Sequence, residues 1–367
     1  MTLITTQYDK LGGGLGSFLK NTFEPSLYNS MKIKGSEMIP YVNFETGSPD
    51  KGMEQFYDSP RYSSGYAALF QTLSFIPETH MLKPFADRVK ATYRLMEIFI
   101  QQASVHAIEL ISTRKKAREL VKSQVNFPLS WKTDSSKYSM ITFKGYEQGF
   151  KNSDATGLQR MFYDRTKPFS REVKYFNVFS PFNMIGKPIS YVIPQGWDNV
   201  IRLLKLNGVR MRQLKKDSAI TVFSYHIEDY KSSSRPYEKH HRNVEVKTST
   251  AQQEIKFLKG DYLIELNQEA NRYIVEMLEP SGDDSFFSWN FFDAILQQKE
   301  GYSDYRWEDL AAEVLRKDPD LKVKLEAKKA LDQKFAANSG EQLNFIYKNS
   351  PYYEPAHLKY PVYRIGG

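Results

Sequence analysis

The stretch that most constrains this chain is the short apolar run at residues 74–82, which contains one carboxylate and stands directly before a long helical pattern. Two apolar residues precede Glu78 and two follow it. Pro84 suits a first helical turn, and apolar residues then recur at helical spacing. A carboxylate between a buried strand and a helix lies where open α/β sheets place their chemistry. The run therefore predicts a strand over residues 74–79, a helix over 84–111 and Glu78 at the end of the strand, where a plain surface carboxylate is the alternative.

The rest of residues 1–120 alternates between strand and helix patterns. We expect strands at residues 1–6 and 39–44, helices at 17–34 and 67–72, and a flexible approach at the glycine-rich residues 12–16. Those glycines match neither the dinucleotide fingerprint nor the P-loop spacing, so they predict no phosphate site. The predicted fold class is α/β, with the strands at 1–6, 39–44 and 74–79 adjacent in a mixed sheet and the two long helices over its faces.

The pattern changes past Leu120, where alternating apolar and polar residues become frequent. Expected strands lie at residues 128–146, 173–179, 189–193, 220–227, 260–266 and 273–278, and expected helices at 197–206, 307–315 and 321–337. We therefore divide the chain into an α/β domain at residues 1–120 and a β-rich mixed α+β region at residues 121–367.

Composition narrows the function classes. The net charge of +8 would permit nucleic-acid binding, but the basic residues are dispersed. The densest run, residues 114–118, ends a predicted helix and is read as a solvated helix terminus, so no nucleic-acid partner is expected. No apolar run is long enough to span a membrane, and the first residues lack the features of a secretory signal. The chain has no Cys, which excludes disulfides, thiolate nucleophiles and Cys-ligated metals.

Residues 75–84, Phe-Ile-Pro-Glu-Thr-His-Met-Leu-Lys-Pro, follow a Tyr-rich segment and precede the long helix. In this arrangement the chain resembles zinc carboxypeptidases of the carboxypeptidase A type, and most of all their large bacterial members with a C-terminal extension. The order of elements agrees over residues 1–120, and the remainder resembles the extension. The resemblance implies peptide-bond hydrolysis at C-termini, a periplasmic or secreted parent protein, and Glu78 as the general base that activates zinc-bound water.

The same resemblance implies substrate-binding residues in the segment before Glu78. The family's mobile Tyr lies on a loop next to small residues and ahead of a short helix. Tyr62, followed by Ser63-Ser64-Gly65, is the best match, with Tyr66 and Tyr57 as alternatives. We therefore assign Tyr62, Ser64 and Tyr66 as candidate substrate-binding residues. Half-buried packing, the commoner role of a Tyr, remains the alternative for each Tyr.

Zinc is the cofactor that the resemblance implies for the full-length parent. A catalytic zinc needs about three protein ligands, and the family's ligands would all precede residue 1. Within the chain, His106 and Glu109 match His-x-x-Glu only as a string inside a helix, and His240 and His241 lie in a polar, basic loop. We therefore expect no zinc on this chain alone and interpret it as a truncated, inactive form. The alternative is a non-catalytic peptide-binding, glycan-binding or scaffold protein that retains the fold.

Overall fold

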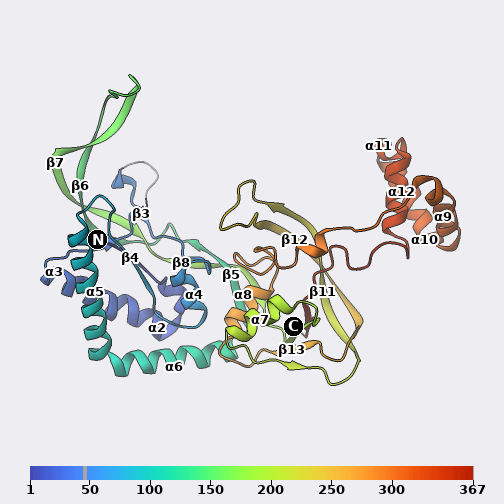
Figure 1. Cartoon of the computed structure of the whole chain (residues 1–367), viewed down its shortest axis with the longest axis horizontal. Coiled ribbons are helices and arrows are strands. Elements are labelled where there is room, and N and C mark those ends of the chain that lie inside the picture. Colours follow the sequence, from blue (N-terminus) through green and yellow to red (C-terminus); the bar gives the residue numbers. More distant parts are fainter. Residues whose placement is uncertain (44–47, 367) are drawn as a thin grey trace.

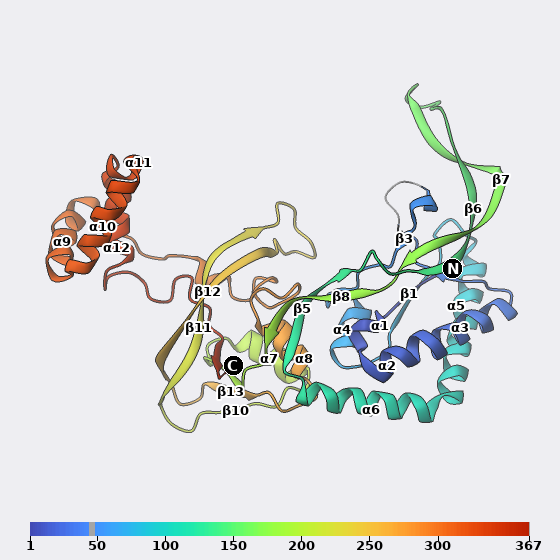
Figure 2. The same ribbon diagram turned by 180° about the vertical axis from the view of Figure 1, so that it is seen from behind.

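The structure is a computed structural model that describes residues 1–43 and 48–366. Three parts follow one another along its long axis (Figure 1): an N-terminal part with mixed strands and helices, a central part around a six-stranded sheet, and a small helical part. The view from behind shows the same order reversed (Figure 2). The fold is α/β, as predicted. No described helix combines the length and the apolar character needed to cross a membrane.

The N-terminal sheet contains the three strands that the sequence predicts to be adjacent. Its order is β2-β1-β4, with β1 at Thr2–Thr5, β2 at Ile39–Pro40 and β4 at Phe75–Glu78. β1 runs parallel to β2 and antiparallel to β4, which sets Thr2 opposite Glu78. The predicted strand at 39–44 is shorter than expected, and its last residue, Phe44, lies outside the described residues.

The helices before β2 differ from the predicted flexible glycine segment and single helix. They are α1 (Tyr8–Leu11), α2 (Gly13–Phe18), the π-helical turn η1 (Leu19–Phe23) and α3 (Glu24–Ile33). Gly12 separates α1 from α2, and the glycines after it lie in α2. Gly16 has no room for a side chain, because a Cβ there would lie 2.3 Å from the carbonyl oxygen of Tyr8. The π-turn divides the predicted helix at 17–34 into three pieces.

Three short elements precede β4: the turn η2 (Pro49–Lys51), the strand β3 (Met53–Glu54) and the helix α4 (Ser63–Leu69). α4 begins four residues earlier than the predicted helix at 67–72, because Tyr62 has extended backbone and starts it.

The long helix after β4 is two helices rather than one. α5 (Phe85–Val105) and α6 (Ala107–Ser123) meet at His106, whose backbone ends the first and begins the second. The His106 ring lies 5.9 Å from that of Phe18 and 6.4 Å from that of Phe23. This aromatic packing holds the corner from which α6 leads toward the central part (Figure 1).

Two strand pairs follow α6, and the first of them runs between the N-terminal and central parts (Figure 1). β5 (Asn126–Thr133) pairs with β8 (Phe179–Gly186), and β6 (Ser139–Asn152) pairs with β7 (Gln159–Phe176). The β6–β7 hairpin projects away from the rest of the molecule (Figure 1), while the other end of β7 pairs with β3. The predicted strand at 128–146 is therefore parts of two strands.

The central sheet has the order β10-β13-β9-β14-β11-β12. Its strands are β9 (Ser190–Ile193), β10 (Arg212–Gln213), β11 (Ser218–Ser232), β12 (Asn243–Phe257), β13 (Tyr262–Glu265) and β14 (Tyr363–Ile365). The helix α7 (Asp198–Leu206) confirms the helix predicted at 197–206. The region expected to be β-rich thus contains most of the strands, although its boundary at residue 121 stays a prediction.

The predicted strand at residues 273–278 is wrong, because this segment is the helix α8 (Asn271–Leu278). All of its residues are buried. Arg272 and Glu276 stand four positions apart and pair at 2.5 Å along the helix, but from residue 273 on only one polar residue interrupts the apolar run. So short a run does not separate a buried helix from a buried strand.

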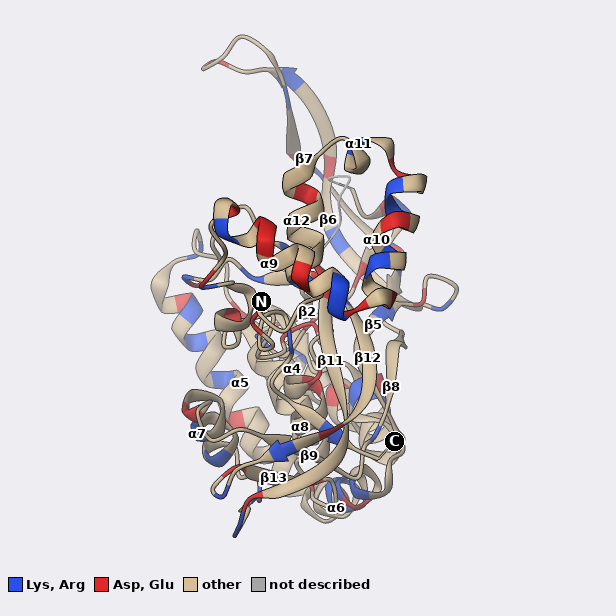
Figure 3. Cartoon of the chain, turned by 90° about the vertical axis from the view of Figure 1, so that its right-hand side faces the viewer, with Lys and Arg blue, Asp and Glu red and all other residues tan. Residues whose placement is uncertain are grey.

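The helical part follows the short turn η3 (Asp293–Leu296). It consists of α9 (Asp304–Lys317), α10 (Pro319–Leu331), α11 (Gln333–Ala336) and α12 (Ser339–Lys348). The helix predicted at 321–337 is α10 and α11, because Asp332 ends the first and caps the second. Trp307 and Tyr347 belong to a separate apolar core. Charges of both signs cover the outside of these helices (Figure 3).

Candidate functional site

Glu78 is the last residue of β4 and is exposed to solvent. The chain leaves β4 through a turn in which the Leu82 N–H donates to His80 Nδ1 at 3.2 Å. The turn and the start of α5 are exposed as well. The carboxylate therefore stands at an open end of the sheet, where water or a bound molecule can reach it.

The side of the molecule next to Glu78 carries an unusual apolar surface. Within the described residues, β4 pairs only with β1, so its outer edge is free. On the following helix, large apolar side chains recur at helical spacing and are exposed; we call this the open face of α5, and it comprises Phe85, Val89, Tyr93, Met96 and Ile100. Phe85 and Ile100 are each 72% exposed. Since Leu95 and Ile98 on the same helix are buried, α5 is apolar on more than one side, as helices enclosed by protein usually are.

Tyr62 stands at the start of α4, in a loop that contacts the central part. Its ring packs edge-on against Phe56 at 4.8 Å. Burial and the neighbouring Tyr237 raise the pKa of Tyr62. The preceding residue, Arg61, forms an ion pair with Asp284 at 2.9 Å and lies over the Tyr237 ring. The loop that carries Tyr62 is thus held against residues far along the chain.

Ser64 and Tyr66 lie on the same short helix but in different surroundings. Ser64 is buried, and the next residue, Gly65, packs so closely that a Cβ would lie 2.2 Å from the Asp58 carbonyl oxygen. Tyr66 is exposed, and its hydroxyl donates to Asn207 in the central part. Ser64 therefore has a packing position, while Tyr66 can meet a ligand.

The four predicted site residues fall into two groups. Ser64 and Tyr66 lie on α4, and Tyr62 is the residue just before it. α4 packs beside β4, which carries Glu78. The contacts of Tyr62 and Tyr66 nevertheless lead to Tyr237 and Asn207 rather than to Glu78. The structure thus sets the two groups on neighbouring elements without a described contact between them.

A buried polar network, which the sequence analysis missed, joins the N-terminal and central parts. Lys10 pairs with Asp58 at 2.7 Å, and the Tyr57 hydroxyl donates to Asp283. Burial raises the pKa of Asp283. Asp284 accepts from both Arg61 and Arg242, at 2.9 and 3.2 Å. The sequence contained a sign of this network, because two adjacent carboxylates, Asp283 and Asp284, stand just before the aromatic run at residues 286–292.

The histidines do not form the ligand set of a catalytic zinc. Nδ1 of His240 lies 3.1 Å from Asn290 Oδ1, and Nδ1 of His241 lies 2.8 Å from the Ser233 carbonyl oxygen. His106 packs among aromatic rings instead of pairing with Glu109 as a ligand. In the described part of the chain, no three His, Cys, Asp or Glu side chains are grouped as metal ligands would be. These residues do not fit the zinc that the resemblance implies.

Comparison of the chain with protein-family models, with curated proteins and with solved structures finds no match in any of the three. The function is therefore argued from the residues and their geometry.

Proposed function

We propose that the N-terminal part is the general-base-bearing portion of a metallocarboxypeptidase-like hydrolase, with Glu78 as the base. The observation that carries this proposal is the position of Glu78: a solvent-exposed carboxylate at the end of a sheet strand, directly before a long helix. Such a carboxylate accepts a proton from the water that attacks a peptide carbonyl and passes it to the leaving amine. Zinc would be held by a segment outside this chain.

The open face of α5 supports the same proposal. Its five large apolar side chains, spaced three or four positions apart on one helix, form a continuous exposed apolar surface. Single apolar residues scattered over a protein surface do not form such a patch. Together with the free edge of β4, these five side chains favour an α/β domain that a further polypeptide segment completes. In the proposal, this segment carries the metal ligands, and Tyr62 and Tyr66 contact the peptide substrate.

A non-catalytic binding protein is the second candidate, and the β6–β7 hairpin favours it. Tyr146, Phe150 and Tyr163 are exposed on this projecting hairpin. Aromatic faces on an exposed arm suit binding of a peptide or a glycan, and this role needs neither zinc nor Glu78.

The test of the hydrolase is Glu78→Gln in the chain expressed together with a zinc-ligand segment of this family. Gln keeps the size and hydrogen-bonding capacity of Glu but does not take the proton from water. We expect turnover to fall on the order of a hundredfold or more, with little change in the Michaelis constant. Glu54→Gln and Glu97→Gln are the matched controls, since both are exposed carboxylates on other elements.

The outcome separates the two candidates. If an active complex forms and Glu78→Gln is as active as the parent, Glu78 is not the base and the hydrolase proposal fails. An equal loss in Glu54→Gln would show that a different carboxylate does the work. Peptide or glycan binding that survives Glu78→Gln and disappears with Tyr146→Ala and Phe150→Ala would support the binding protein instead.

A further inference from the structure

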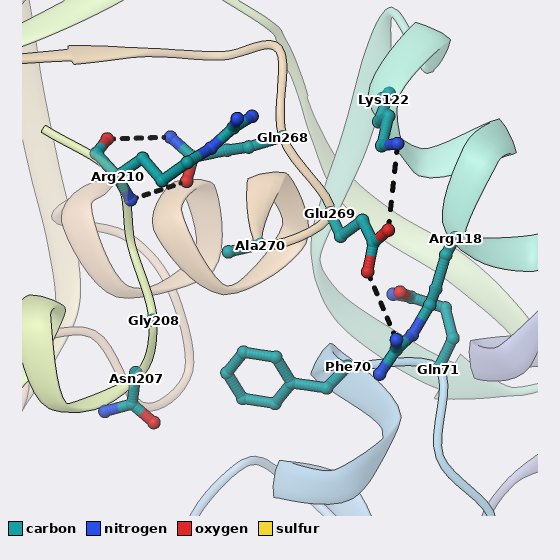
Figure 4. Close-up of a pocket in the computed structure, with 10 residues that line it drawn as sticks. All are labelled: Phe70, Gln71, Arg118, Lys122, Asn207, Gly208, Arg210, Gln268, Glu269 and Ala270. Atoms are coloured by element: carbon teal, nitrogen blue, oxygen red, sulfur yellow. Dashed lines mark hydrogen bonds and ion pairs between the residues drawn. The ribbon is translucent and has the colours of Figure 1, made fainter.

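A cavity of about 380 Å³ lies where the N-terminal and central parts meet (Figure 4). The end of α4, one side of α6, the turn after α7 and the residues just before α8 form its walls. Pockets for small ligands begin at roughly this size. The cavity is separate from Glu78 and uses none of the four predicted site residues.

The charged side chains of the cavity lining are one carboxylate, Glu269, and three cations around it. Glu269 lies 3.2 Å from the Arg118 guanidinium and 3.7 Å from the Lys122 ammonium, with one carboxylate oxygen toward each (Figure 4). Arg210 adds a third cation to the wall. Lys122 also pairs with Glu119 at 2.8 Å. The lining thus carries three cations and one carboxylate, a surplus of positive charge that an anionic ligand would neutralise.

Gln71 provides an independent sign of a ligand. It is only 2% exposed, and its backbone has a φ of +48°, a conformation that residues other than glycine rarely adopt. Its side-chain N–H group donates to the Leu69 carbonyl oxygen at 3.0 Å, while its Oε1 is buried without a hydrogen-bond partner. In Figure 4 the amide points toward the Glu269–Arg118 pair. An unsatisfied buried acceptor costs stability unless a bound donor meets it.

One wall is apolar. The Phe70 ring lines the cavity and is held by two aromatic neighbours, Tyr66 at 5.4 Å and Tyr273 at 5.3 Å. The Tyr273 hydroxyl accepts from Asn207 at 2.9 Å, which fixes the side of the cavity opposite α6. A methylene chain can pack against such a ring.

We propose that this cavity binds a free acidic α-amino acid, the class to which glutamate belongs. Its α-carboxylate pairs with Arg118 and Lys122, and its ammonium group donates to Glu269 and to the free Oε1 of Gln71. The methylenes lie against Phe70, and the side-chain carboxylate faces Arg210. This arrangement satisfies Gln71 and reduces the surplus charge of the lining from +2 to +1, because the ligand brings two negative charges and one positive.

A simple anion fits the cavity less well. Acetate would satisfy the cations, but it would face the Glu269 carboxylate and leave Gln71 Oε1 without a donor. The site therefore selects for a ligand that carries an ammonium group close to a carboxylate. This inference does not depend on the proposed hydrolase activity.

The first experiment is calorimetric titration of the full chain with L-glutamate. We expect saturable binding at one site, and a loss of about tenfold or more in affinity in Arg118→Gln, which removes one charge-assisted pair. Lys115→Gln is the matched control, because Lys115 lies on the same helix, is exposed and does not line the cavity. Absence of saturable binding up to about 10 mM glutamate would overturn the proposal.

The second experiment compares glutamate with acetate, which carries only the carboxylate, in the variant Glu269→Gln. Glu269 is 46% exposed on its side chain, so this variant is expected to fold as the parent does. Glutamate should bind about tenfold more weakly in Glu269→Gln, whereas acetate should bind as well or better, since a competing carboxylate is gone. If glutamate binds to Glu269→Gln as well as or better than to the parent, as acetate is expected to, the cavity is a general anion site and the amino-acid assignment is wrong.

Discussion

The sheets of the N-terminal and central parts differ in how completely they are enclosed. In the central sheet, every residue of β9 is buried, and α8 is buried along its whole length. In the N-terminal sheet, β4 ends in exposed residues and α5 carries the open face. The interior strand β9 and the helix α8 are enclosed by apolar partners within the chain, whereas α5 beside the N-terminal sheet offers a row of large apolar side chains to water. The open face of α5 and the outer edge of β4 are therefore the surfaces on which a partner segment would bind.

The largest expected effect comes from equivalent truncations in the two parts. Phe287 is fully buried in the central core, so Phe287→Ala should lower the free energy of unfolding by about 3–5 kcal/mol. Phe85 lies on the open face, so Phe85→Ala should change it by less than about 0.5 kcal/mol. Urea unfolding followed by circular dichroism measures both. A large loss in Phe85→Ala would mean that the open face is covered in the isolated chain.

A smaller effect is expected where α4 meets the loop before it. Gly65→Ala places a Cβ 2.2 and 2.3 Å from the carbonyl oxygens of Asp58 and Ser59, so the backbone must move. The expected cost is about 1–3 kcal/mol, measured as a lower unfolding midpoint. Gly196→Ala is the control, because nothing lies within 4 Å of its Cβ position. Equal stability of the two variants would show that the backbone at Asp58 and Ser59 moves away from α4 at little cost in free energy.

A third effect depends on pH and concerns the junction. Burial raises the pKa of Asp283, so the folded chain holds this proton more tightly than the unfolded chain does. The stability that Asp283 contributes therefore decreases as the pH rises from about 4. Asn does not titrate, so the melting temperature of Asp283→Asn relative to the parent should increase between pH 4 and 7.

The control for this prediction has the opposite sign. Hydrogen bonds from Ser136 and the neighbouring Lys137 lower the pKa of the half-buried Asp134. Its contribution to stability is present at neutral pH and is lost as the pH falls below about 4 and through its lowered pKa. The melting temperature of Asp134→Asn relative to the parent should therefore decrease as the pH rises through this acidic range, and it should change little between pH 4 and 7. If the relative melting temperatures of both variants change with pH in the same direction, burial between the N-terminal and central parts does not raise the pKa of Asp283.

The smallest expected effect on stability belongs to the open face itself. Tyr93→Gln together with Ile100→Gln replaces side chains that are 64% and 72% exposed. The melting temperature should hardly change, while binding of a hydrophobic dye should decrease. Leu95→Gln, at a position 1% exposed on the same helix, should destabilise the chain strongly. Strong destabilisation by the double variant would show that the face is already packed.

The sequence predicted the N-terminal sheet well because its strands are short, apolar and separated by clear turn signals. β1, β2 and β4 are adjacent as expected, and α7, with its one polar and one apolar face, was also found. The failures have physical causes. The apolar run in α8 is too short to separate a buried helix from a buried strand, and the corner at His106 depends on packing against distant rings.

The candidate sites show the same limit. Glu78 could be singled out because a lone carboxylate in an apolar run is visible in sequence. The cavity beside Gln71 could not, because its lining comes from segments near residues 70, 118, 208 and 269 that only the fold brings together. Likewise, the partners of Tyr57 and Arg61 lie more than 200 positions along the chain.

The position of β14 has a consequence for how the chain folds while it is being synthesised. β14 begins at Tyr363, after every other described strand, yet it lies between β9 and β11 in the interior of the central sheet. Its Arg364 completes a buried pair with Glu279 at 3.1 Å. A nascent chain on the ribosome therefore holds β9 and β11 unjoined until the helical part has emerged, and closing that long loop is slow. During this interval both strand edges stand open, so synthesis is the period when the protein most needs protection from aggregation.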